Sequence, residues 1–210
     1  MNNLISIKNI SKSFSNNKKI PVLKKIIYSF KKGKIYSLMG PSGSGKSTLL
    51  NILSMIDKPS TGSLLISNDV INFNNNTEND KIRAKKIGII YQQNNLLPDF
   101  TALENVYLAG LALSNDKKNS IKKAKKIIKE MGLSFREDHY PSELSGGEIQ
   151  RIAMARALIN EPEIILADEP TGSLDHSTAK EVFNVLYNLK NKNRLIIYAT
   201  HNRFFANMAD

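Results

Sequence analysis

Apolar positions along the chain form short runs whose spacing predicts alternating strands and helices. Residues 4–10 alternate apolar and polar positions, which predicts a strand near a sheet edge, and residues 22–30 have a similar half-buried pattern. Elsewhere, continuous apolar runs predict buried strands, and apolar positions three and four residues apart predict helices. The further predicted strands are residues 35–39, 87–91, 164–167 and 195–200, and the predicted helices are residues 47–56, 101–113, 119–131 and 177–190.

Two segments depart from this alternation. Residues 68–80 are rich in asparagine, which predicts a surface loop. Between about residues 94 and 160 the pattern becomes mainly helical. We therefore expect one α/β domain over residues 1–210, with a core of about residues 1–93 and 161–210 and a helical subdomain inserted at about residues 94–160.

The chain is strongly basic, and codon bias offers a simple explanation for this charge. The 210 residues include 30 Lys and Arg against 19 Asp and Glu, giving a formal net charge of +11, which favours polyanions and anionic membranes. However, 24 Lys, 24 Asn and 25 Ile share AT-rich codons, so codon bias accounts for much of the charge. The lysines of residues 117–129 surround an apolar helical stripe, which is typical of a solvated face. We predict no specific nucleic-acid partner.

Composition also excludes several kinds of chemistry. The chain has no cysteine, which excludes disulfides, thiolate nucleophiles and cysteine-based metal sites. Its three histidines are too scattered to predict a histidine metal cluster. No run of about eighteen apolar residues predicts a membrane span, and the first residues lack the pattern of an export signal.

The clearest chemical motif lies between the strand at 35–39 and the helix at 47–56. Residues 40–47 read GPSGSGKS and match the phosphate-binding pattern G-x-x-x-x-G-K-[ST] in its required context. Glycines let backbone N–H groups turn toward phosphate oxygens, and the helix directs its positive end there. Lys46 would bind the β and γ phosphates and Ser47 would bind Mg²⁺. The predicted nucleotide-binding residues are Gly40, Pro41, Ser42, Gly43, Ser44, Gly45, Lys46, Ser47 and Thr48.

A second part of such a site follows the strand at 164–167. Asp168 is placed to hold Mg²⁺ through water, and Glu169 to polarise the water that attacks the γ-phosphate. Residues 191–194 read NKNR and lack the aspartate of the guanine-specific N-K-x-D pattern, which argues against a GTPase.

Residues 144–148 read LSGGE and are followed by a helical segment, IQRIAMARAL. With the two phosphate motifs, this segment resembles the signature of the ATP-binding cassette (ABC) family. The resemblance implies a P-loop fold with a RecA-like core, an N-terminal antiparallel β region and a helical subdomain. It also implies that two cassettes enclose two ATP molecules, each bound by the signature of the opposite subunit. The implied signature contacts are Ser145, Gly146, Gly147 and Glu148.

The same resemblance implies roles for four other positions. Gln92 corresponds to the glutamine that contacts Mg²⁺ and the attacking water, and His201 to the histidine that contacts the γ-phosphate. Residues 173–175 correspond to a loop that crosses the dimer interface, and Phe14 to the aromatic residue that stacks on adenine. The implied catalytic residues are Glu169, His201, Gln92 and Lys46, and the implied Mg²⁺ ligands are Ser47, Gln92 and Asp168.

The resemblance covers about residues 4–208 and is strongest to one branch of the family. The segment LLPDFTALENV at residues 96–106 is similar to the branch that contains lipoprotein-releasing, macrolide-exporter and cell-division cassettes. Asn202 and Ile149 depart from the family pattern at positions that contact no phosphate. Family members usually continue further beyond the position of His201, so we expect the C-terminal end to be shorter than theirs.

Together these features predict the ATPase subunit of a membrane transporter. The expected assembly is a homodimer with integral membrane permease subunits, on the cytoplasmic face of the bacterial inner membrane. Release of lipoproteins is the leading interpretation, and a macrolide-exporter or cell-division complex, including a weakly catalytic regulatory cassette, is the alternative. A third class, a soluble ATPase acting on DNA or ribosomes, usually carries two cassettes or a long coiled-coil insert, and this sequence shows neither.

Overall fold

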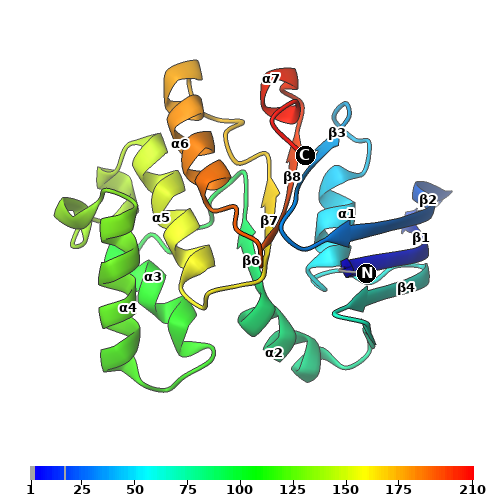
Figure 1. The fold of residues 1–210 in the computed structure, drawn as a ribbon, viewed down its shortest axis with the longest axis horizontal. Coiled ribbons are helices and arrows are strands. Elements are labelled where there is room, and N and C mark those ends of the chain that lie inside the picture. The colour runs from blue at the N-terminus through cyan, green and yellow to red at the C-terminus, as the bar shows by residue number, and fades with distance from the viewer. Residues whose placement is uncertain (1–2, 17) are drawn as a thin grey trace.

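The computed structural model describes residues 3–16 and 18–210, and its larger strands form two sheets (Figure 1). The parallel sheet has the strand order β3-β8-β7-β6. β-branched and leucine residues dominate it, and most of them are buried because both faces of the sheet are covered. Its strands are β3 (Ile35–Met39), β6 (Ile87–Ile90), β7 (Ile164–Asp168) and β8 (Leu195–Thr200), within one residue of the predicted runs.

The second sheet is antiparallel and has the order β2-β1-β4-β5. It consists of β1 (Asn3–Asn16), β2 (Lys18–Lys31), β4 (Thr61–Ile66) and β5 (Asp69–Val70). The strand predicted near a sheet edge at residues 4–10 is part of β1, which pairs with the edge strand β2 on one side and with β4 on the other. The alternation arises because only one face of this sheet packs on the core, as antiparallel sheets allow.

Helices connect and cover the sheets (Figure 1). The predicted loop at residues 68–80 is wrong in part, because it contains β5 and the first turns of α2. Asn75 caps that helix by accepting a hydrogen bond from the N–H of Glu78 at 3.2 Å, a capping signal that the asparagine-rich composition obscured. The helices are α1 (Lys46–Leu53), α2 (Asn76–Lys86), α3 (Ala102–Leu111), α4 (Lys117–Glu130), α5 (Gly146–Leu158), α6 (His176–Asn188) and α7 (Arg203–Ala206).

Within the described ranges, no helix combines the length and the apolar character that crossing a bilayer requires.

Strand β7 separates two hydrophobic cores. Ile165 and Ala167 belong to a core that includes residues of α3, α4, α5 and α6. Ile164 and Leu166 point the other way, into a core shared with α1 and the antiparallel sheet. Because side chains alternate along a strand, one segment of five residues anchors both halves of the molecule. The carboxyl end of β7 is thereby fixed in place.

Helices α3, α4 and α5 pack together on one side of the parallel sheet (Figure 1). On α4, Ala124 and Ile128 are fully buried, whereas all the lysines of residues 117–129 are exposed, as the pattern predicts. Several of these lysines meet carboxylates, such as Lys125 with Glu137 at 3.2 Å. The lysines of this helix therefore form a solvated face, and local ion pairs partly neutralise their charge.

Asn105 secures the loop that precedes α3. The side chain is only 2% exposed; its amide donates to the carbonyls of Leu97, Phe100 and Thr101 at 3.1, 2.9 and 3.0 Å, and its oxygen accepts from the N–H of Leu97 at 2.7 Å. One buried amide thus bonds four backbone groups of this exposed turn, and it is the partner that the described structure shows for the N–H of Leu97 and the carbonyl of Phe100.

We predict that Asn105→Ala lowers the free energy of unfolding by about 2–3 kcal/mol, because the turn loses the hydrogen bonds of a buried side chain. Urea unfolding followed by circular dichroism measures the change. The exposed Asn184→Ala on α6 is the control and should change stability by less than about 0.5 kcal/mol. Equal effects of the two substitutions would contradict the role assigned to Asn105.

Candidate active site

The loop between β3 and α1 forms a cradle that is open to an anion. Gly43 and Gly45 adopt left-handed backbone angles, φ 78° and 90°, and a Cβ on Gly45 would lie 2.9 Å from Cγ1 of Val22. In the described chain, no side chain caps α1 and its first turn holds no acidic residue. The free N–H groups and the positive end of this helix therefore point to a ligand with negative charge.

Lys46 bends back toward the same loop. Its Nζ donates to the carbonyls of Gly40 at 2.7 Å and Pro41 at 3.1 Å, and its side chain is 11% exposed. The ammonium group is therefore held beside the cradle, where it can turn toward an anion in place of the carbonyls.

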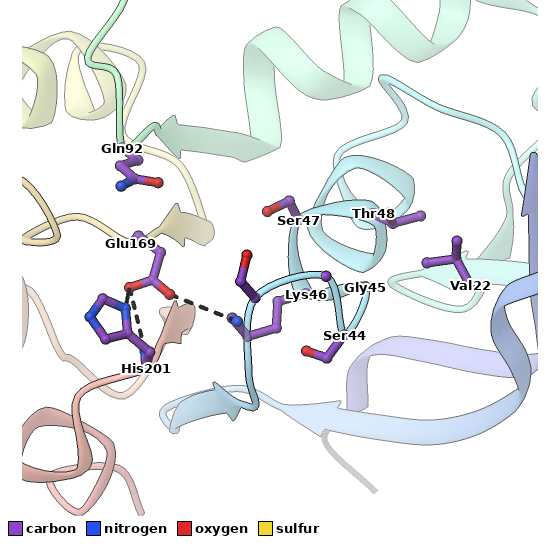
Figure 2. A pocket seen from close by; sticks show the side chains of 11 residues that line it. Val22, Ser44, Gly45, Lys46, Ser47, Thr48, Gln92, Glu169 and His201 are labelled. Carbon is purple, nitrogen blue, oxygen red and sulfur yellow. Dashed lines mark hydrogen bonds and ion pairs between the residues drawn. The ribbon is translucent and has the colours of Figure 1, made fainter.

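This loop borders a cavity of about 560 Å³ (Figure 2). The other lining residues come from distant parts of the chain: Val22 from β2, Gln92 from the segment after β6, Glu169 from the end of β7 and His201 from the end of β8. Gln92, Glu169 and His201 meet because parallel strands bring their carboxyl ends to one edge of a sheet. The residues of the loop and of the first turn of α1 that line the cavity are Ser42, Gly43, Ser44, Gly45, Lys46, Ser47 and Thr48.

Glu169 occupies the centre of this group. Its Oε2 lies 2.9 Å from Nδ1 of His201, and its Oε1 lies 3.8 Å from Nζ of Lys46, as the dashed lines in Figure 2 show. Its backbone has φ 45°, a left-handed conformation that is strained for a residue with a side chain. Such strain persists where the surrounding structure fixes the residue, and it is concentrated at functional sites.

Asp168 precedes Glu169 and has an unsatisfied oxygen. Its Oδ1 is buried and finds no hydrogen-bond partner among the described residues. Buried carboxylate oxygens normally have a partner. A hard cation that prefers oxygen ligands, such as Mg²⁺, would supply one, so the residues at this point fit the predicted ion.

The remaining predicted residues lie away from the cavity. Phe14 is 46% exposed on β1, and Nζ of Lys12 lies 4.9 Å from the centre of its ring. Among the described residues that line the cavity, none comes from residues 145–148 at the start of α5. One copy of the chain therefore brings together the phosphate loop, Gln92, Glu169 and His201, but not the signature.

A comparison with protein-family models matches residues 23–172 to the ABC transporter family. The chain belongs to this family. Curated relatives include lipoprotein-releasing system ATP-binding proteins named LolD. That of Rickettsia bellii is 44% identical over all of this chain and 93% of the relative. That of Cytophaga hutchinsonii is 43% identical over 91% of this chain and 88% of the relative.

Solved structures of ABC cassettes confirm the predicted fold class. The dimeric ATP-binding cassette MJ0796 bound to ADP and phosphate superposes with a TM-score of 0.90 at 39% identity, over 98% of this chain and 91% of that one. A second dimeric structure of MJ0796, described as a bacterial ABC transporter cassette, gives a TM-score of 0.87 at 40% identity over the same shares. The chain is therefore an ABC ATP-binding cassette homologous to LolD.

The structure of this ABC cassette also shows contacts that the sequence patterns did not indicate. On α5, Arg156 donates to the carbonyls of Asn94 at 2.5 Å and Asn95 at 2.6 Å, and Gln150 donates to the carbonyl of Tyr91 at 3.3 Å. These side chains tie the segment around Gln92 to the helix that carries the signature. No local pattern marks them, because their partners lie about sixty residues away.

Two polar residues at positions that the family resemblance singled out cap helices. Asp175 accepts from the hydroxyl and N–H of Ser177 and from the N–H of Thr178, and these bonds hold the pKa of its carboxyl far below its usual value. Asn202, one of the departures from the family pattern, accepts from the N–H of Phe204 at 2.9 Å and caps α7. Asparagine and aspartate cap helices equally well, so this departure from the family pattern keeps the cap.

Proposed function

We propose that two copies of this cassette bind and hydrolyse ATP to power the release of lipoproteins through membrane permease subunits. The observation that carries the proposal is the convergence of Lys46, Gln92, Glu169 and His201 on one cavity beside an uncapped helix. The name of its LolD relatives, a lipoprotein-releasing system ATP-binding protein, supports the cargo. Residue identity near 44% along the whole chain supports the same role here.

In this proposal each side chain has a distinct task. Lys46 leaves the carbonyls of Gly40 and Pro41 and binds the β and γ phosphates, aided by the N–H groups of the loop. Glu169 accepts a proton from the water that attacks the γ-phosphorus while the bond between the γ-phosphorus and the β–γ bridging oxygen breaks, giving ADP and phosphate. His201, already bonded to Glu169, orients that carboxylate and contacts the γ-phosphate.

Ser47, Gln92 and Asp168 would hold Mg²⁺, partly through water. The orphaned Oδ1 of Asp168 supports this set. When bound, the ion neutralises charge on the phosphate oxygens. Phe14 would lie against adenine, which its exposed ring on β1 permits.

A second copy would complete the site. Ser145, Gly146, Gly147 and Glu148 lie outside the cavity of their own chain, so they are available to a nucleotide bound by a partner copy. The solved MJ0796 structures are dimeric. We propose a homodimer with one ATP between the phosphate loop of each copy and the signature of the other.

The segment from Asn94 to Thr101 would transmit the change to the permease subunits. It begins next to Gln92 and is tied to α5 through Arg156. Leu97 and Phe100 expose 46% and 37% of their surfaces there, which suits contact with another protein. The helical subdomain of about residues 94–160 would move as one unit, and the cassette would sit on the cytoplasmic face of the inner membrane through these partners.

Reconstitution tests the proposal. The purified cassette should hydrolyse ATP, and in vesicles that also contain the permease subunits, ATP should release a labelled lipoprotein to a soluble acceptor. Lys46→Ala should abolish both activities, because the γ-phosphate loses its mobile cation. If the cassette hydrolyses ATP but releases no lipoprotein, the proposed cargo is wrong. Export of a macrolide would then favour a macrolide exporter, and the absence of any cargo would favour a cell-division complex. A wild-type cassette that does not hydrolyse ATP would contradict the proposal.

A further inference from the structure

Glu148 closes the first turn of the signature helix. Its Oε2 accepts from the N–H of Ser145 at 2.8 Å, and the Ser145 hydroxyl accepts from the N–H of Glu148 at 3.3 Å. This reciprocal pair is a capping box, and it fixes the backbone of Ser145 at the start of α5. The side chain of Glu148 is 12% exposed. The geometry of the signature serine therefore depends on this carboxylate.

The same carboxylate carries a charge in an unfavourable place. Its bond to the N–H of Ser145 and its contact with Arg136 lower the pKa of Glu148 to about 2, so the group is ionised at neutral pH. In the proposed dimer, the start of α5 faces the γ-phosphate of a nucleotide held by the other copy. Two negative groups repel each other, and the repulsion is greater in a partly buried site than in water.

Arg136 provides the opposing charge. Its Nε donates to Oε1 of Glu148 at 2.8 Å, so each oxygen of the carboxylate has its own partner. Its Nη1 lies 3.0 Å from Nε2 of His139. A charge-assisted bond of this length fixes the carboxylate while neutralising it.

The segment that carries Arg136 is itself anchored. The carbonyl of Glu137 accepts from the N–H of Leu103 at 2.9 Å, and the carbonyl of His139 accepts from the N–H of Ala102 at 2.8 Å. The first turn of α3 thus holds residues 137–139 in place. Arg136, the residue before this segment, connects it to Glu148 at the start of α5. The guanidinium is therefore in place before any nucleotide arrives.

We infer that Arg136 is a positioning residue for the signature: it neutralises Glu148 and holds the capping box, so that Ser145 can meet the γ-phosphate of the opposite copy. This inference rests on the proposed ATP-binding dimer. It predicts that the importance of Arg136 depends on the charge at position 148, and not only on packing.

A double-mutant cycle on the full chain tests this dependence. Arg136→Gln should raise the KM for ATP about tenfold and change kcat by less than about threefold, because the uncompensated carboxylate opposes closure around ATP but takes no part in proton transfer. Adding Glu148→Gln removes that carboxylate and keeps an acceptor for the N–H of Ser145. The double variant should therefore recover a KM within about threefold of the Glu148→Gln single variant.

Two further variants keep the outcome decisive. Arg136→Lys retains the charge and should raise KM by less than about threefold. If Arg136→Gln does not fold, a rise of about tenfold in the KM of the folded Arg136→Lys variant contradicts the role of the charge. The exposed Lys118→Gln, which removes a positive charge from α4, should leave KM within about twofold of wild type. Thermal unfolding of each variant separates a loss of fold from a loss of affinity.

Two results would overturn the inference. One is an unchanged KM in Arg136→Gln, and the other is a raised KM that Glu148→Gln does not restore. Either result, obtained while the wild type hydrolyses ATP, leaves the proposed function standing. Absence of hydrolysis in the wild type would instead contradict the proposed function itself.

Discussion

Glu169→Gln is expected to lower the rate of ATP turnover by about 10²- to 10⁴-fold, the range over which a general base contributes to catalysis. The carboxamide has nearly the same shape as the carboxylate but cannot accept a proton from water at neutral pH. The loss of turnover should be large because this carboxylate is held in a defined place: it is only 13% exposed and lies 2.9 Å from Nδ1 of His201. The fold should persist, since the side chain keeps its volume.

Nucleotide binding should survive in the same variant. In the wild type, Oε1 of Glu169 lies 3.8 Å from Nζ of Lys46, so its charge competes with the phosphates for that cation. Removing the charge should leave ATP affinity equal or higher. Phosphate release and titration with a fluorescent ATP analogue measure the two effects separately.

The control for this substitution is Glu163→Gln. Glu163 is a surface residue, 40% exposed, in an ion pair with Lys32 at 2.8 Å. Its replacement should leave turnover within about twofold of wild type, since exposed ion pairs contribute little. Turnover of Glu169→Gln within fivefold of wild type would remove Glu169 from the role of general base.

Phe183→Ala is expected to lower the free energy of unfolding by about 3–5 kcal/mol, a large part of the stability of an ordinary domain. Phe183 is 2% exposed on α6, its ring stacks on Phe205 of α7 with 4.5 Å between centroids, and it meets the ring of Tyr198 edge-on at 5.2 Å. Truncation leaves a cavity where α6, α7 and β8 meet. That cavity would lie beneath the strand end that carries His201.

Phe204→Ala provides a matched control beside the same cluster. Phe204 is the chain neighbour of Phe205, but it is 52% exposed. Its truncation should lower stability by less than about 1 kcal/mol, because little apolar area returns to water. Urea unfolding gives both values. Similar losses in the two variants would show that the aromatic cluster does not organise this part of the core.

The parallel strands and their helices could be predicted from the sequence because each is a contiguous pattern. An apolar run such as residues 164–167 predicts a buried strand wherever it lies in the fold, and β7 follows it within one residue. The position of a strand within a sheet cannot be predicted from such a contiguous pattern. Residues 4–10 predict a strand by their alternation, but only pairing with the distant strand β4, in addition to the adjacent β2, decides that β1 lies inside the sheet.

The phosphate loop is the part of the site that the sequence determined by itself. Its glycines, Lys46 and the helix that follows are consecutive, so one short segment specifies both the conformation and the charge of the cradle. The sequence also indicated Glu169, by its place after an apolar strand, and His201, through a family resemblance. It could not show that their side chains share a hydrogen bond, since 32 residues separate them.

Tertiary structure alone decided which side chains support the site. Arg136 reaches Glu148, and Arg156 reaches the carbonyls beside Gln92, across folds of the chain that no local pattern records. Packing likewise buries Oδ1 of Asp168 and leaves it without a hydrogen-bond partner among the described residues. Local sequence thus determined the elements and the phosphate chemistry, because both depend on neighbours in the chain. The electrostatic surroundings of that chemistry depend on neighbours in space, and only the folded structure supplies them.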